Sequence, residues 1–122
     1  MNILLESPVN VMRFYVRGVV YRVACADIIY METQNRNVVV HTRERKISVP
    51  YLKLSDCVEK GEGRFVRCHR SLIVNPFYIQ DIYISKRQIV LTEGRGELVI
   101  GRKYIPDVRR IFDVGRITQY TG

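Results

Sequence analysis

The chain has 122 residues, of which 47% are hydrophobic and 26% charged, a composition that fits one globular domain and excludes a disordered or fibrous protein. Twenty lysines and arginines against twelve aspartates and glutamates give a net charge of +8, which indicates a polyanionic partner. No apolar run approaches the roughly 20 residues of a membrane span, and no secretory signal is visible. The three cysteines (Cys25, Cys57 and Cys68) have the spacing of neither a disulfide framework nor a zinc ribbon, so we expect a reducing cytoplasm.

The N-terminal half consists of apolar and β-branched segments separated by turn signals. Gly18 marks a tight hairpin, residues 34–37 form a polar turn, and residues 43–45 form the tip of another hairpin. After Pro50, apolar residues at helical spacing and a closing Gly61 predict a first helix. In chain order we expect strands over residues 12–17, 19–24, 28–33, 38–42 and 46–49, and then the helix over 51–60.

The C-terminal half continues the same pattern and closes with a helix. Lys86 and Arg87 are expected to form a two-residue hairpin connection, and Pro106 suits the first turn of a helix over 105–112. The sequence predicts a mainly β domain of roughly nine strands with one or two short helices. The domain is expected to span residues 10–113, with flexible termini at 1–9 and 114–122. The expected strands here are 65–68, 72–74, 79–85, 88–92 and 97–100.

Positive charge is concentrated in three segments, residues 34–46, 64–70 and 86–103. Each has a net charge of +3, and the rest of the chain has −1. The phosphate backbone of a nucleic acid favours such clustering. In addition, an arginine fork can bind a guanine edge, and asparagine can bind adenine in the same way. The three segments are therefore candidate nucleic-acid contacts.

Catalytic and metal-binding patterns are not supported. Cys68 and His69 are adjacent and would point to opposite faces of a strand, and His41 lacks partners at metal-ligand spacing. No glycine-rich phosphate loop is present, so we expect no enzyme activity, no cofactor and no metal. Cys68 is expected to fill the core. Asn75, beside Pro76, is expected to hold a turn by bonding local backbone.

Two nucleic-acid-binding motifs with clear sequence signatures are missing. The chain has no pair of adjacent helices for a helix-turn-helix and no aromatic consensus of an RNA-recognition sheet. Four strings instead resemble, in order, the LytTR family, the DNA-binding domain of LytR- and AgrA-type bacterial response regulators. The most distinctive string, Phe65 to Asn75, has an aromatic residue, then Arg-x-His-Arg-Ser and an apolar run ending in Asn. The other three are residues 27–32, 38–42 and 98–104.

The resemblance implies small antiparallel sheets whose loops, rather than a recognition helix, enter the DNA grooves. It also implies base contacts from three places in the chain. Gly101 stands where the family often has a serine or valine, next to the third of these places. The implied base contacts are Arg36, Asn37, His69, Arg70 and Arg102, and we assign phosphate contacts to Arg43, Arg45, Lys46, Ser71, Lys86 and Lys103.

The function expected from these observations is sequence-specific binding of double-stranded DNA in bacterial transcriptional regulation. The chain would act as the output domain of a two-component response regulator or as a stand-alone regulator. A receiver domain or sensor kinase is expected outside this chain, a dimer on DNA is one arrangement it allows, and no membrane partner is expected. Two alternatives stay open, an RNA-binding or ribosome-associated basic β domain, and a protein–protein module with an acidic partner.

Overall fold

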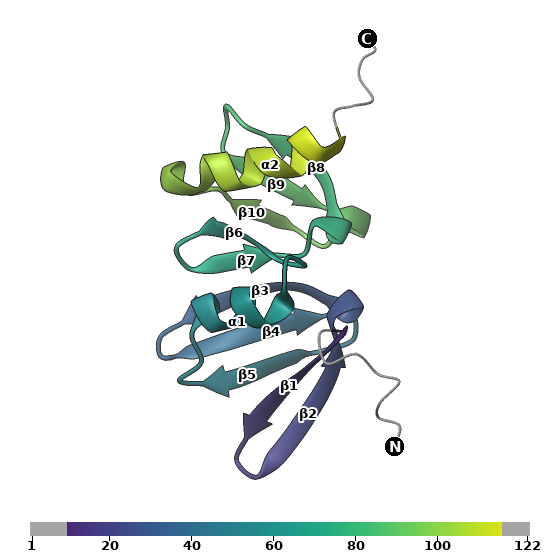
Figure 1. Ribbon diagram of the computed structural model, residues 1–122, viewed down its shortest axis with the longest axis vertical. Helices are drawn as coiled ribbons and strands as arrows, with labels where there is room; N and C mark the ends of the chain where they lie inside the picture. Colours follow the sequence, from purple (N-terminus) through teal and green to yellow (C-terminus); the bar gives the residue numbers. More distant parts are fainter. Residues whose placement is uncertain (1–9, 116–122) are drawn as a thin grey trace.

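The computed structural model describes residues 10–115 and the side chains up to residue 111. The expected flexible segment 1–9 and residues 116–122 of the expected flexible segment 114–122 therefore lie outside the described residues. Ten strands lie within the described part, in three small antiparallel sheets with two α-helices (Figure 1). This arrangement confirms the mainly β prediction. Helix α2 runs from Ile105 to Gly115, three residues beyond the helix end expected at residue 112.

The first sheet is a hairpin, and the two larger sheets follow it along the chain. β1 (Val11–Val16) and β2 (Val19–Ala24) pair through the expected tight turn at Arg17 and Gly18. The second sheet has the order β5-β4-β3-β7-β6 and the third β10-β9-β8. Their strands are β3 Ile28–Gln34, β4 Asn37–Thr42, β5 Lys46–Pro50, β6 Val66–His69, β7 Leu72–Val74, β8 Ile79–Tyr83, β9 Gln88–Leu91 and β10 Glu97–Val99. The helices are α1 Leu54–Gly61 and α2 Ile105–Gly115, with short 3-10 turns η3 Cys25–Asp27, η4 Pro76–Tyr78, η5 Thr92–Gly94 and η6 Arg102–Tyr104.

The five-stranded sheet separates two hydrophobic cores. One core lies on the side of α1 and the β1–β2 hairpin, and the other lies toward the three-stranded sheet and α2 (Figure 1). Ile73 and Val74 are neighbours in β7 and are both fully buried, but Ile73 belongs to the first core and Val74 to the second. Successive side chains of a strand point to opposite faces, so apolar residues on both faces of the central strands allow the sheet to be covered on both sides.

The first helix begins later than the sequence predicts. α1 starts at Leu54 rather than at residue 51, because Tyr51 has a positive φ of 57° and its amide donates to the Arg36 carbonyl. Gly61 is the last helical residue, and Glu62, not Gly61, adopts the left-handed conformation after it. A Cβ on Gly61 would lie 2.4 Å from the Phe65 ring. Gly61 therefore ends the helix as predicted, and its lack of a side chain is required for close packing against Phe65.

The β8–β9 connection is longer than the sequence predicts. β8 ends at Tyr83, which pairs with Gln88, so the turn contains four residues (84–87) rather than Lys86 and Arg87 alone. Arg87 has a positive φ of 51°, and its amide donates to the Ile84 carbonyl. This bond closes the turn before Ile84 and Ser85 can pair as strand, which is why the expected strand over 79–85 is too long.

Two polar residues singled out in the sequence have structural roles. Cys68 is fully buried, and burial raises the pKa of its thiol to about 12, so it fills the core as predicted. Asn75 is buried and its amide nitrogen donates to the carbonyls of Cys25 and Ile28, at 3.3 and 2.9 Å. Its Oδ1 accepts from the Phe77 amide at 3.0 Å. Asn75 therefore joins the end of β7 to η3 and caps η4, which confirms the predicted turn-holding role.

We expect Asn75→Ala to lower the free energy of unfolding by about 1–3 kcal/mol, because it leaves buried backbone groups without partners. Urea unfolding followed by circular dichroism would measure the change. Gln80→Ala is the matched control, since the Gln80 amide is exposed and bonds the Asp81 carboxylate; a change within about 0.5 kcal/mol is expected there. Equal stability of the two variants would contradict the role assigned to Asn75.

Candidate nucleic-acid interface

Several turns meet at one end of the two larger sheets, along the left edge of Figure 1. Backbone hydrogen bonds of 2.8–2.9 Å join them, from the Thr33 amide to the Ser71 carbonyl and from the Gly101 amide to the Cys68 carbonyl. A third bond of 2.9 Å, between the Ile100 amide and the Arg87 carbonyl, brings in the β8–β9 turn. We call this end of the molecule, formed by residues 35–37, 69–71, 84–87 and 101–103, the basic edge.

The β3–β4 turn presents Arg36 rather than Asn37. Gln34 pairs with Asn37, so the turn itself is Asn35 and Arg36, with Asn35 at a φ of 58° that asparagine tolerates better than most residues. The Arg36 side chain is exposed, whereas Asn37 is half-buried as the first residue of β4. The bond from Tyr51 to the Arg36 carbonyl ties the tip to the end of β5. Arg36 is therefore the better placed of the two to reach a partner.

The β6–β7 turn fixes the ring of His69. The Ser71 amide donates to His69 Nδ1 at 3.1 Å, and the Ser71 hydroxyl lies 3.0 Å from the same nitrogen. A nitrogen that accepts from an amide carries no proton, so in the neutral ring the proton lies on Nε2. His69 thus offers an N–H donor, while Ser71 serves to orient the ring.

Arg67, in β6, supports the β6–β7 turn through two hydrogen bonds. Its Nε–H donates to the His69 carbonyl at 2.9 Å, and its Nη2 donates to the Arg70 carbonyl. Arg70 itself is exposed, and its side chain has no hydrogen-bond or ion-pair partner within residues 10–111. In the sequence, Arg67 contributes only to a charged segment, and its position shortly before the turn is the one signal of a supporting role.

The third place, η6, carries Arg102 and Lys103 on a turn held at its start. The Gly101 amide binds the Cys68 carbonyl, and the Tyr104 amide donates to the Gly101 carbonyl at 2.8 Å. A Cβ on Gly101 would lie 3.2 Å from the Tyr104 ring and 3.5 Å from the His69 ring. Glycine therefore lets η6 approach the β6–β7 turn closely, which accounts for its presence where the family often has a larger residue.

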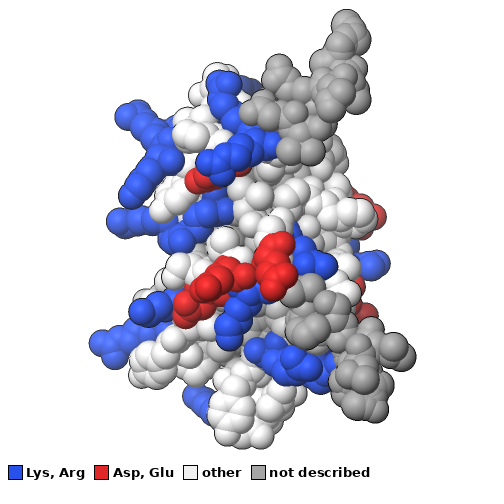
Figure 2. All heavy atoms as spheres, viewed as in Figure 1, with Lys and Arg blue, Asp and Glu red and all other residues white. Residues whose placement is uncertain are grey.

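The charge of the basic edge is not compensated by carboxylates. Figure 2 shows lysine and arginine side chains gathered along this edge, whereas the acidic side chains in view lie mainly over α1. Among the described residues, no carboxylate forms an ion pair with any of the five exposed cations here. Unpaired like charges on one edge raise the local potential for an anion. These five are Arg36, Arg70, Lys86, Arg102 and Lys103.

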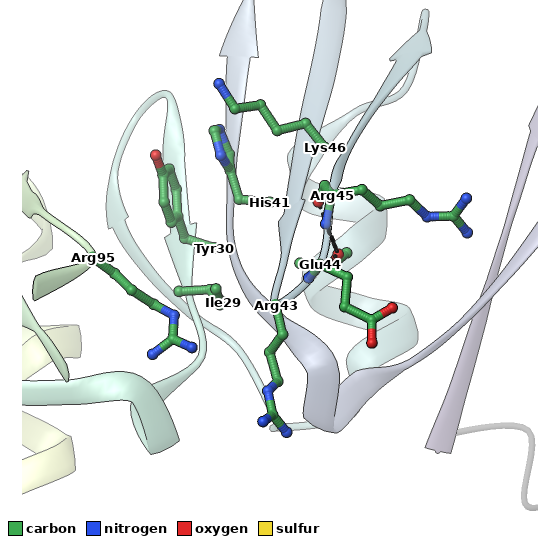
Figure 3. A pocket seen from close by; sticks show the side chains of 9 residues that line it. Ile29, Tyr30, His41, Arg43, Glu44, Arg45, Lys46 and Arg95 are labelled. Carbon is green, nitrogen blue, oxygen red and sulfur yellow. Dashed lines mark hydrogen bonds between the residues drawn. The ribbon is translucent and has the colours of Figure 1, made fainter. Parts of the chain in front are cut away.

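The structure does not bring Arg43, Arg45 and Lys46 to the basic edge. Arg43 and Arg45 lie in the β4–β5 turn and Lys46 begins β5, at the far end of the sheet, about 17–20 Å away along the six residues of β4. There they line a depression of about 440 Å³ with Arg95 (Figure 3). Figure 3 shows Arg45 pointing away from Arg95, and Arg45 lies 5.1 Å from the Tyr21 ring.

The far end is also closer to charge balance. Arg43 lies 3.9 Å from Asp27, and Arg95 lies 2.6 Å from Glu93. His41 stacks on Tyr30 and lies 3.2 Å from Glu32, and burial lowers the pKa of its ring. A histidine with a lowered pKa is neutral near pH 7 and adds no positive charge. This end is therefore a weaker candidate for a polyanion than the basic edge.

Neither a membrane-spanning helix nor a metal-binding cluster is found among the described residues. Within residues 10–115, no helix is long and apolar enough to cross a membrane. The same part of the chain contains no group of three histidine, cysteine or acidic side chains that could hold a metal ion.

An uncompensated basic edge built from turns is typical of nucleic-acid-binding proteins. The LytTr DNA-binding domain family matches residues 18–113, and the chain belongs to this family, which confirms the resemblance and makes it a DNA-binding domain of transcription regulation. A solved structure is similar in fold with a TM-score of 0.69, 21% identity, and coverage of 84% of this chain and 96% of that one. It is described as the LytTr DNA-binding domain of a methyl-accepting/DNA response regulator from Bacillus cereus. A search of curated proteins finds no match.

Proposed function

We propose that the domain binds double-stranded DNA in a sequence-specific manner and reads the bases with the turns of its basic edge rather than with a helix. The observation that carries this proposal is the convergence of four turns with unpaired cations on one edge. In the strand order β5-β4-β3-β7-β6, the β3–β4 and β6–β7 turns are two strand spacings apart, about 10 Å. That separation fits a major groove about 12 Å wide and equals about three base-pair rises.

The side chains divide by their chemistry. The forks of Arg36, Arg70 and Arg102 suit guanine edges, and the His69 N–H suits a base acceptor. Lys86 and Lys103 are flexible point charges that suit phosphates. Asn37 and Ser71 are half-buried, and we assign them supporting contacts, Asn37 to a base and Ser71 to a phosphate.

We leave Arg43, Arg45 and Lys46 out of this interface. A duplex that receives the basic edge faces away from the β4–β5 turn, since the two turns lie at opposite ends of β4. The sequence-based assignment of these three residues to phosphates is thus a competing prediction, which the Lys46→Ala and Arg43→Ala controls test. The far end instead offers basic side chains for use as charge-matched controls.

We further propose that the domain is a binding module without enzyme activity, working on bacterial DNA in the cytoplasm. The similar Bacillus cereus domain comes from a response regulator, which supports the idea of an output domain with a receiver domain or sensor kinase outside this chain. A stand-alone regulator is the other form. Dimers on paired half-sites would be compatible with either form.

Titration of a labelled duplex and of the matched single strand at two salt concentrations tests the proposal, after selection of bound sequences from a random duplex pool. We expect preference for the duplex, dependence on its sequence and weaker binding at higher salt. Preference for a single strand would support an RNA-binding domain. An RNA-binding domain would favour single strands because side chains cannot read the deep, narrow major groove of an A-form RNA duplex. Absence of binding to all nucleic acids would leave a protein–protein module with an acidic partner.

Replacing Lys86 with alanine is expected to weaken binding to all duplexes to about the same extent and to lower the salt slope by about one. Lys86 lies in the β8–β9 turn, exposed, with its Nζ 5.4 Å from the Tyr83 ring. Lys46→Ala removes the same charge at the far end and is expected to leave the slope close to that of the wild type. If Lys86→Ala also keeps the salt slope of the wild type, Lys86 does not belong to the proposed interface.

A further inference from the structure

One arginine connects two of the turns that the proposed function assigns to base reading. Arg67 lies half-buried in β6, and its guanidinium donates to the adjacent carbonyls of His69 and Arg70. The same group lies 5.6 Å from the centre of the Tyr104 ring in η6. The planar guanidinium of Arg67 thus bonds the backbone of the β6–β7 turn and lies against the Tyr104 ring of η6.

The backbone of the two turns is joined at the same place. The Gly101 amide donates to the Cys68 carbonyl at 2.8 Å. Cys68 is the residue between Arg67 and His69 in the chain. The close approach of Gly101 to the rings of His69 and Tyr104 leaves little free space there. The β6–β7 turn and η6 therefore form one packed unit, and Arg67 is the side chain that spans it.

We propose that Arg67 is a positioning residue for DNA recognition, which sets the β6–β7 turn and η6 in one arrangement so that Arg70 and Arg102 reach the same duplex together. The proposal rests on the proposed function. A bidentate base contact depends on a planar fork aimed at one base edge, and an exposed arginine on a free turn would lose side-chain and backbone entropy on binding. Arg67 reduces this loss at both turns at once.

The chemistry of arginine is what the position requires. Its guanidinium has five N–H donors in a rigid plane, so it can serve two carbonyls and stack on a ring, whereas a lysine ammonium is a compact point charge. The Nε and Nη2 donors of Arg67 point at protein carbonyls rather than outward. These contacts favour a positioning role over a phosphate contact, which becomes an outcome of the test.

The test compares Arg67→Ala and Arg67→Lys with Arg64→Ala. Arg64 is a half-buried arginine of the same segment whose side chain bonds Asn10 and the Gly61 carbonyl, away from the basic edge. Affinities are measured for the selected duplex, for its single-base variants and for a scrambled duplex, with thermal unfolding beside them. We expect Arg67→Ala to lose about tenfold in discrimination at the base positions read by both turns. Affinity for the scrambled duplex and the salt slope are expected to match those of Arg64→Ala.

Arg67→Lys keeps the charge but not the fork, and we expect it to restore little of the discrimination. Because a lysine there keeps the charge and the packing of the stem, this variant carries the same test if the alanine variant does not fold. The losses from Arg67→Ala and Arg70→Ala are expected to be less than additive, as for residues in one network.

Three results would overturn the inference. Recovery of full discrimination by lysine would show that only charge matters at this position. Equal weakening on every duplex with a lower salt slope would show a phosphate contact. Additive losses for Arg67 and Arg70 would show independent roles. A wild-type protein without sequence preference on any duplex would instead overturn the proposed function itself, so the two failures are distinguishable.

Discussion

Replacing Arg70 with alanine is expected to cost about 1–3 kcal/mol of discrimination between the selected DNA site and its single-base variants. Arg70 is exposed at the tip of the β6–β7 turn, and its carbonyl is held by Arg67 while its own guanidinium is unpaired among the described side chains. A fork presented on a held backbone can bind one base edge in a bidentate manner. The loss should therefore fall on one or two positions of the site and spare the others.

Binding titrations on the selected duplex, on all its single-base variants and on a scrambled duplex would measure this effect. Arg43→Ala is the matched control, since Arg43 is an exposed arginine at the far end of the sheet. It should leave base preference unchanged. If Arg70→Ala weakens the selected and scrambled duplexes equally, Arg70 contacts only phosphate.

Most of the strands were predictable from the sequence because local signals determine them. The Arg17-Gly18 turn, the polar turn at residues 34–37 and the β-branched runs between them predict the hairpins close to their observed limits. The errors have two sources. Tyr51 leaves the expected helix because its amide binds the carbonyl of Arg36, a contact that the sequence around Tyr51 does not show. The β8–β9 turn is longer than expected because the Arg87 amide binds the Ile84 carbonyl, and turn residues alone did not specify this closure.

The candidate site was predictable in part, for a geometric reason. Consecutive turns of an antiparallel sheet lie at alternate ends, so a charged segment that includes a whole strand contributes to both ends. Residues 34–46 include β4, which separates Arg36 from Arg43. Residues 86–103 include β9 and β10, and β10 separates Arg102 from Arg95. Net charge along the chain identified the right segments but could not show which cations share an edge.

The sequence of the remaining charged segment, residues 64–70, does not show which of its arginines face outward. Its three arginines contribute equally to the sequence count, yet Arg64 and Arg67 bond protein groups and only Arg70 is exposed. Whether an arginine points outward or folds back onto a carbonyl depends on the turn that follows it. The bulge between Arg67 and His69 brings the turn carbonyls within reach of Arg67, and no local sequence signal specifies it.

Arg102 and Lys103 are adjacent cations on η6 and allow base and phosphate contacts to be distinguished within one turn. Both are exposed, and the Lys103 Nζ lies 6.0 Å from the Tyr104 ring. The hydrogen bonds of Gly101 and Tyr104 hold the backbone on both sides of Arg102, so its fork can be aimed with a small loss of entropy. Lysine offers a point charge that follows a phosphate equally well on any sequence.

We therefore expect opposite results for the two alanine variants. Arg102→Ala should relax the preference at one or two base positions, at a cost of about 1–3 kcal/mol on the selected site, and Lys103→Ala should weaken all duplexes alike and lower the salt slope by about one. Titrations of both variants on the selected site and its single-base variants, at low and moderate salt, would measure the two quantities separately. Unchanged base preference in Arg102→Ala would mean that the third base-reading position implied by the family does not apply to this chain. In that case η6 would contribute to DNA binding through its charge alone.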